Sequence, residues 1–183
     1  MNTARPMHSR PAVTITSVAT ERVVRNPSFG ALLRRPVHFI AFGFGAGLVP
    51  RGPGTAGSLV ALPVYLALAP LAPWAYLLVL LALTLFGVWC TGRTEREIGA
   101  HDHPGIVFDE ITGMLVALFL VPVHWLWLGI GFGLFRLFDV WKPWPIHWLN
   151  TRVPGGWGIM LDDLAAGVAA AACLHGLIRL YGH

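Results

Sequence analysis

Uncharged apolar stretches, separated by short polar segments, dominate the chain from Gly52 onwards. Three of them cover 52–92, 111–135 and 164–178, and none contains Asp, Glu, Lys or Arg. A helix of about 20 apolar residues crosses the hydrocarbon core of a lipid bilayer, which is roughly 30 Å thick. The pattern therefore predicts helices that lie in a membrane.

Proline and glycine mark where these helices begin and end. The first helix is expected to begin near Gly57-Ser58, with Ser58 as its N-cap. The preceding segment, 39–49, is predicted to be interfacial or re-entrant because it is short and glycine-rich. Gly155 to Gly158 are expected to form a loop before the last helix. The expected helices cover about 58–69, 74–90, 110–121, 125–139 and 162–180. The pattern predicts an all-α, membrane-embedded bundle of about five to six helices.

The polar segments predict how the helices are connected. If each apolar stretch is a hairpin, 51–58, 102–110, 136–142 and 162–163 all emerge at one face, and Pro122 provides the break in 111–135. Basic residues that flank a membrane helix are retained in the cytoplasm, so the arginines before the first stretch assign this face to the cytoplasm. These are Arg5, Arg10, Arg22, Arg25, Arg34 and Arg35.

The amino-acid composition supports a membrane protein and argues against some classes of binding partner. The 183 residues are 55% hydrophobic and 12% charged, with a mean hydropathy of +0.63, whereas soluble domains carry about a quarter charged residues. Residues 1–27 are predicted to be a disordered basic tail, and 28–183 to form a single domain. The net charge is +4, but no aromatic-interleaved basic platform follows the tail, so no nucleic acid is expected. No protein partner is predicted.

Paired carboxylates stand at the start of two apolar stretches. Asp109-Glu110 come directly before Ile111, and Asp162-Asp163 come directly before Leu164. Carboxylates crowded at the mouth of an apolar bundle repel one another and lose hydration, and a divalent cation removes this penalty. Oxygen ligands favour a hard ion such as Mg²⁺. A helix cap needs only one acid, so we predict that the pairs bind the metal. The expected ligands are Asp109, Glu110, Asp162 and Asp163.

Basic and small polar residues near these pairs indicate a phosphate site. Arg136 can bind phosphoryl oxygens through two N–H groups, and Lys142 supplies a point charge. Thr55 and Ser58 lie in a segment of small residues whose backbone N–H groups a phosphate can approach. The expected substrate-binding residues are Thr55, Ser58, Arg136 and Lys142. The expected catalytic residues are Asp109, Glu110, Asp139 and Lys142.

One further polar segment has no assigned role. His101, Asp102 and His103 have the side chains of a metal site, but a solvated loop has the same composition. Their part in the chemistry stays open, as do the number of metal ions and a covalent aspartyl-phosphate intermediate.

Several segments together resemble the phosphatidylglycerophosphatase A family of bacterial membrane enzymes. They are 43–47, 53–58, 101–110, 135–146 and 155–163. The resemblance implies Mg²⁺-dependent hydrolysis of phosphatidylglycerophosphate to phosphatidylglycerol and inorganic phosphate, within phospholipid biosynthesis. It also implies a multi-pass protein of the bacterial inner membrane with its active site facing the cytoplasm. Family members commonly have serine where Ala46 stands, so that hydroxyl is not essential in this chain.

Two other functions fit parts of the pattern. A lipid phosphotransferase of the CDP-alcohol type also uses aspartates and Mg²⁺, but it requires three aspartates at four-residue spacings on one helix, and nothing downstream of Asp162-Asp163 supplies them. A cation transporter would carry charges within its apolar spans, whereas here the charges flank them. Both remain alternatives to the phosphatase.

Overall fold

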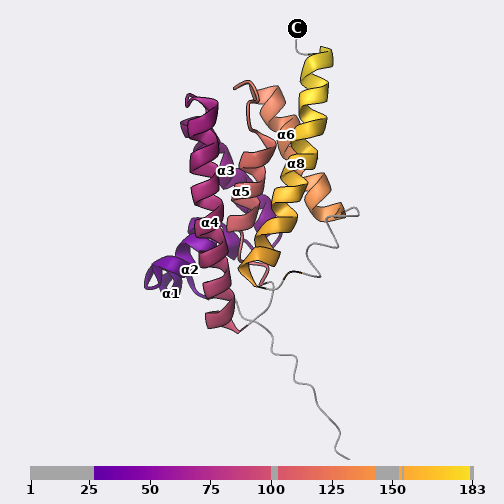
Figure 1. Cartoon of the computed structure of the whole chain (residues 1–183). Coiled ribbons are helices and arrows are strands. Elements are labelled where there is room, and N and C mark those ends of the chain that lie inside the picture. The colour runs from indigo at the N-terminus through magenta and orange to yellow at the C-terminus, as the bar shows by residue number, and fades with distance from the viewer. Residues whose placement is uncertain (1–26, 100–102, 143–152, 154, 182–183) are drawn as a thin grey trace, which may run out of the picture.

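Helices account for most of the residues that the structure describes. The computed structural model describes residues 27–99, 103–142, 153 and 155–181, and within these residues there is no strand (Figure 1). The all-α prediction is confirmed. The helices are α1 (Phe29–Leu33), α2 (Pro36–Ala41), the 3₁₀ helix η1 (Gly43–Leu48), α3 (Pro53–Leu68), α4 (Pro73–Ile98), α5 (Phe108–Ala117), α6 (Trp125–Trp141) and α8 (Gly156–Tyr181).

The number of helices differs from the expectation. The described residues form eight helices, and the expected five to six are not confirmed. The difference lies in 29–48, which forms three short helices, whereas the only element expected in this part of the chain was one interfacial or re-entrant segment over 39–49. The predicted disordered tail falls almost wholly on 1–26, outside the described residues, and the single domain over 28–183 stays a prediction.

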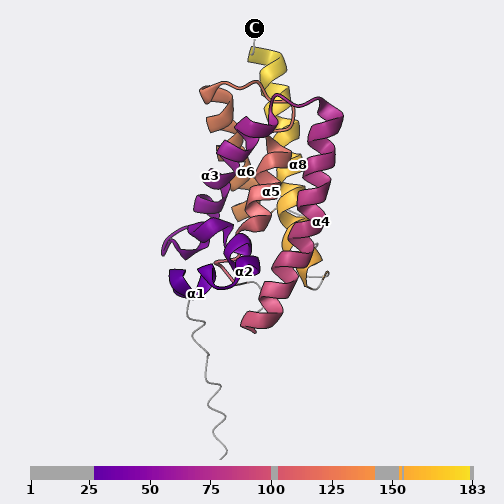
Figure 2. The ribbon, with the colours of Figure 1, turned by 90° about the vertical axis from the view of Figure 1, so that its left-hand side faces the viewer.

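The long helices run side by side, and α5 lies in the middle of the bundle. It contacts α3, α4, α6 and α8 (Figure 2). Figure 1 shows that α5 and α8 begin, and α4 and α6 end, at the end of the bundle where α1 and α2 lie. We call this the site end, and the opposite end, where α8 finishes, the far end. The polar segments therefore meet at one end of the bundle, as the hairpin argument requires.

Two helices begin earlier than the pattern suggested. α3 begins at Pro53 with Gly52 as its N-cap at a φ of 72°, so the expectation that Ser58 caps this helix is wrong. α8 begins at Gly156, so the expected loop over Gly156–Gly158 is also wrong. Glycine is a poor helix former, but a Cβ at Gly156 would collide with the carbonyl oxygen of Val88 on α4. Close packing against α4 therefore outweighs the intrinsic preference.

Helix α4 is longer than expected and α5 is shorter. The segment after Cys90 was expected to be a polar connection, yet α4 continues to Ile98 and ends at Gly99, whose φ is 73°. α5 ends at Ala117, before the turn that contains Pro122. The extension of α4 carries Arg93 and Glu97 beyond the apolar part of the helix, which becomes important below.

Close contact between α5 and α8 sets the position of the acidic residues. A Cβ at Gly113 of α5 would collide with the carbonyl oxygen of Asp163, and a Cβ at Gly167 of α8 would collide with the carbonyl oxygen of Gly113. Two missing side chains thus let the helix backbones touch. The contact brings the first turn of α5 next to the second turn of α8, where the two acid pairs are.

Two helices are long and apolar enough to cross a membrane. They are α4 and α8, with mean hydropathies of 2.0 and 1.5 over their most apolar windows. Exposed tryptophans lie at both ends of the bundle: Trp74 and Trp125 begin helices at the far end, and Trp141 and Trp157 lie at the site end. Tryptophan gathers at the two interfaces of a bilayer. The arrangement is consistent with a membrane protein.

Candidate active site

Three carboxyl groups converge where α5 meets α8. Asp109 and Glu110 lie in the first turn of α5, and Asp163 lies in the second turn of α8. One oxygen of each lies within 4.8 Å of the others. We call these three residues the carboxylate cluster. Asp163 is more than a turn into its helix, so it does not serve as an N-terminal cap.

The cluster contains oxygens that no other described residue satisfies. Asp109 Oδ1, Glu110 Oε2 and Asp163 Oδ2 are buried and have no hydrogen-bond partner among the residues that the structure describes. Most buried polar groups in proteins have such a partner, and a buried carboxylate without one is strongly unfavourable. Three carboxyl groups this close together, each with an unsatisfied oxygen, fit a hard divalent cation such as Mg²⁺.

Burial also changes the protonation of the cluster. Burial and then the nearby charge of Asp163 raise the pKa of Glu110 to about 8. Burial and the charge of Glu110 raise the pKa of Asp109 well above its usual range. Without a cation, these side chains therefore retain protons near neutral pH. A bound cation would displace the protons and favour the charged form.

The fourth expected metal ligand has a different partner. The Lys142 ammonium donates a hydrogen bond to Asp162 Oδ2. Lys142 closes α6 in the left-handed region, with φ 41° and ψ 59°, which is uncommon for a residue other than glycine. Burial lowers the pKa of Lys142, but the hydrogen bond and charge of Asp162 more than compensate and raise it to about 12. Asp162 therefore holds a cationic side chain beside the cluster and is not one of the three grouped carboxylates.

Arg136 and Asp139 form the second charged pair of the site. Arg136 Nη1 lies 2.5 Å from Asp139 Oδ2, one turn along α6, and 3.5 Å from Ser58 Oγ. The Ser58 hydroxyl donates to the carbonyl oxygen of Gly54 at 2.9 Å. Asp139 is buried beside Asp163. Thr55, by contrast, is exposed in the first turn of α3.

Glycine spacing is the signal that sequence reasoning missed. Asp109 and Asp163 are each followed four residues later by a glycine, Gly113 and Gly167, on the same helix face. These are the two glycines that allow α5 and α8 to touch. Gly54 has a similar role, because a Cβ there would collide with Glu110 Oε1 and lie 3.1 Å from Arg136 Nη1.

The histidine-containing segment is only partly described. His101 and Asp102 lie outside the described residues. His103 is buried against Phe42, and its Nδ1 accepts a hydrogen bond from the backbone N–H of Gly105 at 2.9 Å. Burial lowers the pKa of His103. These contacts join the loop to the N-terminal helices, and His103 is not part of the three-carboxylate group.

Comparison with known proteins establishes the family. The family model for phosphatidylglycerophosphatase A matches residues 39–178, which include every residue of the carboxylate cluster. The chain belongs to the phosphatidylglycerophosphatase A family. A phosphatidylglycerophosphatase A of Escherichia coli (strain K12) is 44% identical over 153 residues, covering 82% of this chain and 86% of the relative.

Two further relatives of the family differ in their names. A phosphatidylglycerophosphatase A of Haemophilus influenzae is 38% identical over 147 residues, covering 79% of this chain and 90% of the relative. A protein of Bacteroides thetaiotaomicron named as a candidate phosphatidylinositol-3-phosphatase is 37% identical over 153 residues, covering 79% and 91%. No solved structure matches the chain significantly.

Proposed function

We propose that this protein hydrolyses phosphatidylglycerophosphate to phosphatidylglycerol and inorganic phosphate, using Mg²⁺. Membership of the phosphatidylglycerophosphatase A family supports the substrate and the reaction. The observation that carries the metal dependence is the carboxylate cluster, in which one oxygen from each of two buried aspartates and a half-buried glutamate lies within 4.8 Å of the others, and each residue has a buried oxygen with no partner among the described residues. Asp109, Glu110 and Asp163 are the proposed ligands.

The site divides the chemistry among a few side chains. A Mg²⁺ ion at the cluster supplies Lewis acidity toward a phosphoryl oxygen and a bound water of lowered pKa. Arg136 uses one nitrogen for Asp139 and Ser58, so its other N–H groups would bind the oxygens of the phosphate. Asp139 would hold Arg136 with one oxygen and accept a proton from the attacking water with the other. Lys142, held by Asp162, would neutralise negative charge on the phosphate.

The membrane supplies the rest of the substrate site. We place α4 and α8 across the bacterial inner membrane and the site end at its cytoplasmic face, because the basic residues Arg34 and Arg35 lie at that end, between α1 and α2. The diacyl chains would lie against the exposed apolar faces of the helices. The phosphate monoester would then meet the carboxylate cluster at the membrane surface.

Phosphate release from phosphatidylglycerophosphate by the purified protein tests the proposal. We expect activity with Mg²⁺, none in EDTA, and recovery when Mg²⁺ is restored. The variant Asp163→Asn should be inactive under all three conditions, whereas Glu97→Gln, at an acid of the site end outside the cluster, should behave as the wild type in detergent. Full activity in EDTA would reject the metal mechanism.

A second lipid monoester is the specific alternative. The Bacteroides thetaiotaomicron relative is named for phosphatidylinositol 3-phosphate, so the same assay should include this lipid. We expect a clear preference for phosphatidylglycerophosphate, in agreement with the names of the other two relatives. Equal or faster release from phosphatidylinositol 3-phosphate would keep the phosphatase and the metal site but reject the proposed substrate.

A further inference from the structure

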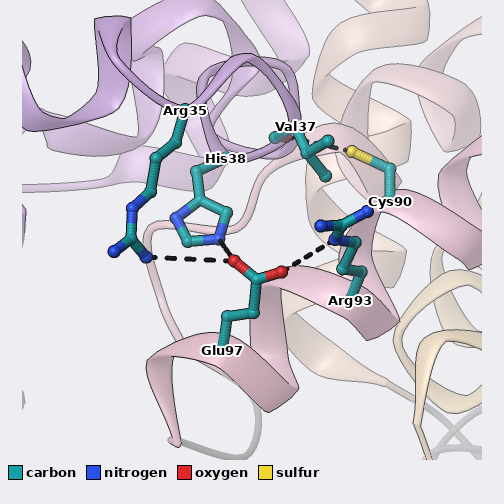
Figure 3. A network of polar contacts seen from close by, with 6 residues as sticks. All are labelled: Arg35, Val37, His38, Cys90, Arg93 and Glu97. Carbon is teal, nitrogen blue, oxygen red and sulfur yellow. Dashed lines mark hydrogen bonds and ion pairs between the residues drawn. The ribbon is translucent and has the colours of Figure 1, made fainter.

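A second charged site lies at the site end, outside the carboxylate cluster. Arg35, His38 and Arg93 converge on Glu97, from the start of α2 and the last turns of α4 (Figure 3). His38 Nε2 donates to Glu97 Oε2 at 2.8 Å, and Arg93 Nε donates to Glu97 Oε1 at 2.7 Å. They line a cavity of about 280 Å³, which we call the guanidinium pocket; its residues are Arg34, Arg35, Pro36, Val37, His38, Arg93 and Glu97.

The pocket has an excess of positive charge. Three arginines and one carboxylate line it, and Glu97 contacts one nitrogen each of Arg35 and Arg93. Each arginine carries five N–H donors, so most of them remain available for a second anion. The side chains of Arg35 and Arg93 are 62% and 49% exposed, so an anion can reach them from solvent. Exposed guanidinium groups that converge on one cavity suit a phosphate group.

An apolar ridge on α4 leads directly into the pocket. Leu77, Leu81, Leu85 and Trp89 are all exposed and repeat every four residues, and the same row continues into Arg93 and Glu97. Side chains four residues apart stand next to one another on a helix surface. The guanidinium carbon of Arg93 lies 5.7 Å from the ring centre of Trp89, so the apolar and cationic parts are in contact. A soluble anion would use only the pocket, whereas an amphiphile would use both parts.

Exposed apolar side chains also lie on α1 and η1, the elements on either side of α2 in the chain. Phe29 and Leu33 of α1 and Phe44 of η1 are more than half exposed, and Phe29 and Phe44 each pack edge-on against Phe39. Arg34 and Arg35 follow Leu33 directly. Apolar and basic side chains arranged in this way lie at the surface of an anionic bilayer. We therefore expect the pocket to lie at the level of the phospholipid headgroups at the membrane surface.

We propose that the guanidinium pocket binds the phosphate of an anionic phospholipid, whose acyl chain lies along the Leu77–Trp89 ridge of α4. The site is separate from the carboxylate cluster, and it rests on the proposed membrane position of α4 but not on the phosphatase reaction. Glu97 has two opposing effects: it orders the arginines, and its negative charge competes with the phosphate. Removing that charge should therefore strengthen lipid binding, while removing an arginine should weaken it.

Native mass spectrometry of the purified protein in detergent can count the bound lipids. The probe is phosphatidylserine, an anionic phosphodiester that is neither substrate nor product of the proposed reaction, and phosphatidylcholine is the zwitterionic control. We expect phosphatidylserine to be retained in preference to phosphatidylcholine. Arg93→Gln and Arg35→Gln should each reduce its affinity by about tenfold, since each removes a charge-assisted hydrogen bond. Glu97→Gln should increase the affinity.

A matched control separates this site from general surface charge. Arg96→Gln removes the same charge from the same end of α4, but Arg96 does not line the pocket, so phosphatidylserine binding should be unchanged. An equal loss with Arg96→Gln, or no preference over phosphatidylcholine, would overturn the proposal. Binding of inorganic phosphate alone as tightly as phosphatidylserine would also overturn it, because a site for free phosphate does not need the ridge.

The outcome can be distinguished from failure of the proposed function. Phosphate release from a detergent-solubilised substrate should be the same in Arg93→Gln, Arg35→Gln and the wild type. Loss of lipid binding with retained turnover supports a separate site. A parallel loss of turnover and lipid binding would place these arginines in the reaction itself and overturn the proposal. Melting temperatures within a few degrees of the wild type would show that each variant is folded.

Discussion

The two charged sites at the site end have opposite imbalances. In the carboxylate cluster, two buried aspartates and a half-buried glutamate lie within 4.8 Å and have oxygens without a partner among the described residues. In the guanidinium pocket, one carboxylate, 37% exposed, is shared by two arginines and a histidine. The first site lacks positive charge and the second has a surplus of it. The comparison indicates a cation ligand for one and an anion ligand for the other.

Unbalanced charge costs more free energy in the buried carboxylate cluster than in the exposed guanidinium pocket. Water can solvate the charged atoms around Glu97 that have no protein partner. The ion pairs of Glu97 therefore contribute little to stability. Around Asp163 no such solvation is available, and the pKa of Glu110 rises to about 8 as a result. Changes in the carboxylate cluster should therefore have large effects on activity and on the metal-free protein, and changes in the guanidinium pocket should have small ones.

The largest expected effect comes from Asp163→Asn. Loss of one proposed ligand should lower turnover by at least about 10²-fold. The melting temperature of the metal-free protein should stay the same or rise, because one of the repelling carboxylates is gone. Phosphate release and thermal unfolding in EDTA check both parts. The matched variant Glu97→Gln should change turnover by less than about twofold. An unfolded Asp163→Asn protein would show that this carboxylate is structural.

Adding a single methyl group next to the site should also lower turnover strongly, because it displaces the site residues. In Gly54→Ala, the new methyl group would collide with Glu110 Oε1 and press on Arg136. A displacement of about 1 Å in a catalytic group can lower turnover by about 10²-fold, so we expect a loss of 10- to 100-fold in a folded protein. Gly133→Ala on α6 is the control, since nothing lies within 4 Å of its Cβ. Unchanged turnover in Gly54→Ala would show that Glu110 does not need its position against α3.

Variants of Asp162 distinguish two roles for this residue. The sequence predicted a metal ligand, whereas the structure shows a partner of Lys142. If Asp162 acts by holding Lys142, then Asp162→Asn and Lys142→Met should each lower turnover by about 10- to 100-fold. The double variant should then be no worse than either single variant, because the two side chains act as a unit. Kinetics of the three variants at saturating Mg²⁺ measure the coupling. A loss of Mg²⁺ affinity confined to Asp162→Asn would instead return it to the ligand set.

The last prediction concerns stability as a function of pH, which needs neither metal nor substrate. The pKa of Glu110 is raised from an unfolded value near 4.5 to about 8, so the folded metal-free protein binds more protons than the unfolded chain between these values. Its free energy of unfolding should therefore fall as pH rises from 5 to 8, by about 1.4 kcal/mol per pH unit for each such proton. Unfolding in EDTA should show a weaker dependence in Glu110→Gln. An identical slope in this variant would contradict the assigned pKa.

Local patterns in the sequence predicted part of this site but not all of it. The acid pairs stand out because charge is so rare in the apolar stretches, and Pro122 correctly indicated that 111–135 turns back on itself. The partners of Asp162 and Glu97 could not be predicted, because each contact joins segments that are far apart in the chain.

The position of a helix end likewise depends both on local sequence and on contacts made in the fold. Gly156 and Gly158 suggested a loop because glycine disfavours helix in isolation. The structure places both inside α8, since the missing side chains permit contact with the carbonyl oxygens of Val88 and Val153. A local pattern shows what a residue prefers alone, and only the fold shows what packs against it.

Binding of Mn²⁺, a paramagnetic substitute for Mg²⁺, tests the comparison most directly. We expect electron paramagnetic resonance of the purified protein to show bound Mn²⁺ that Mg²⁺ displaces. The bound signal should be retained in Glu97→Gln and lost in both Asp109→Asn and Asp163→Asn. A wild-type protein that binds no Mn²⁺, or an Asp163→Asn protein that binds it as tightly as the wild type, would contradict the assignment of the carboxylate cluster as the metal site.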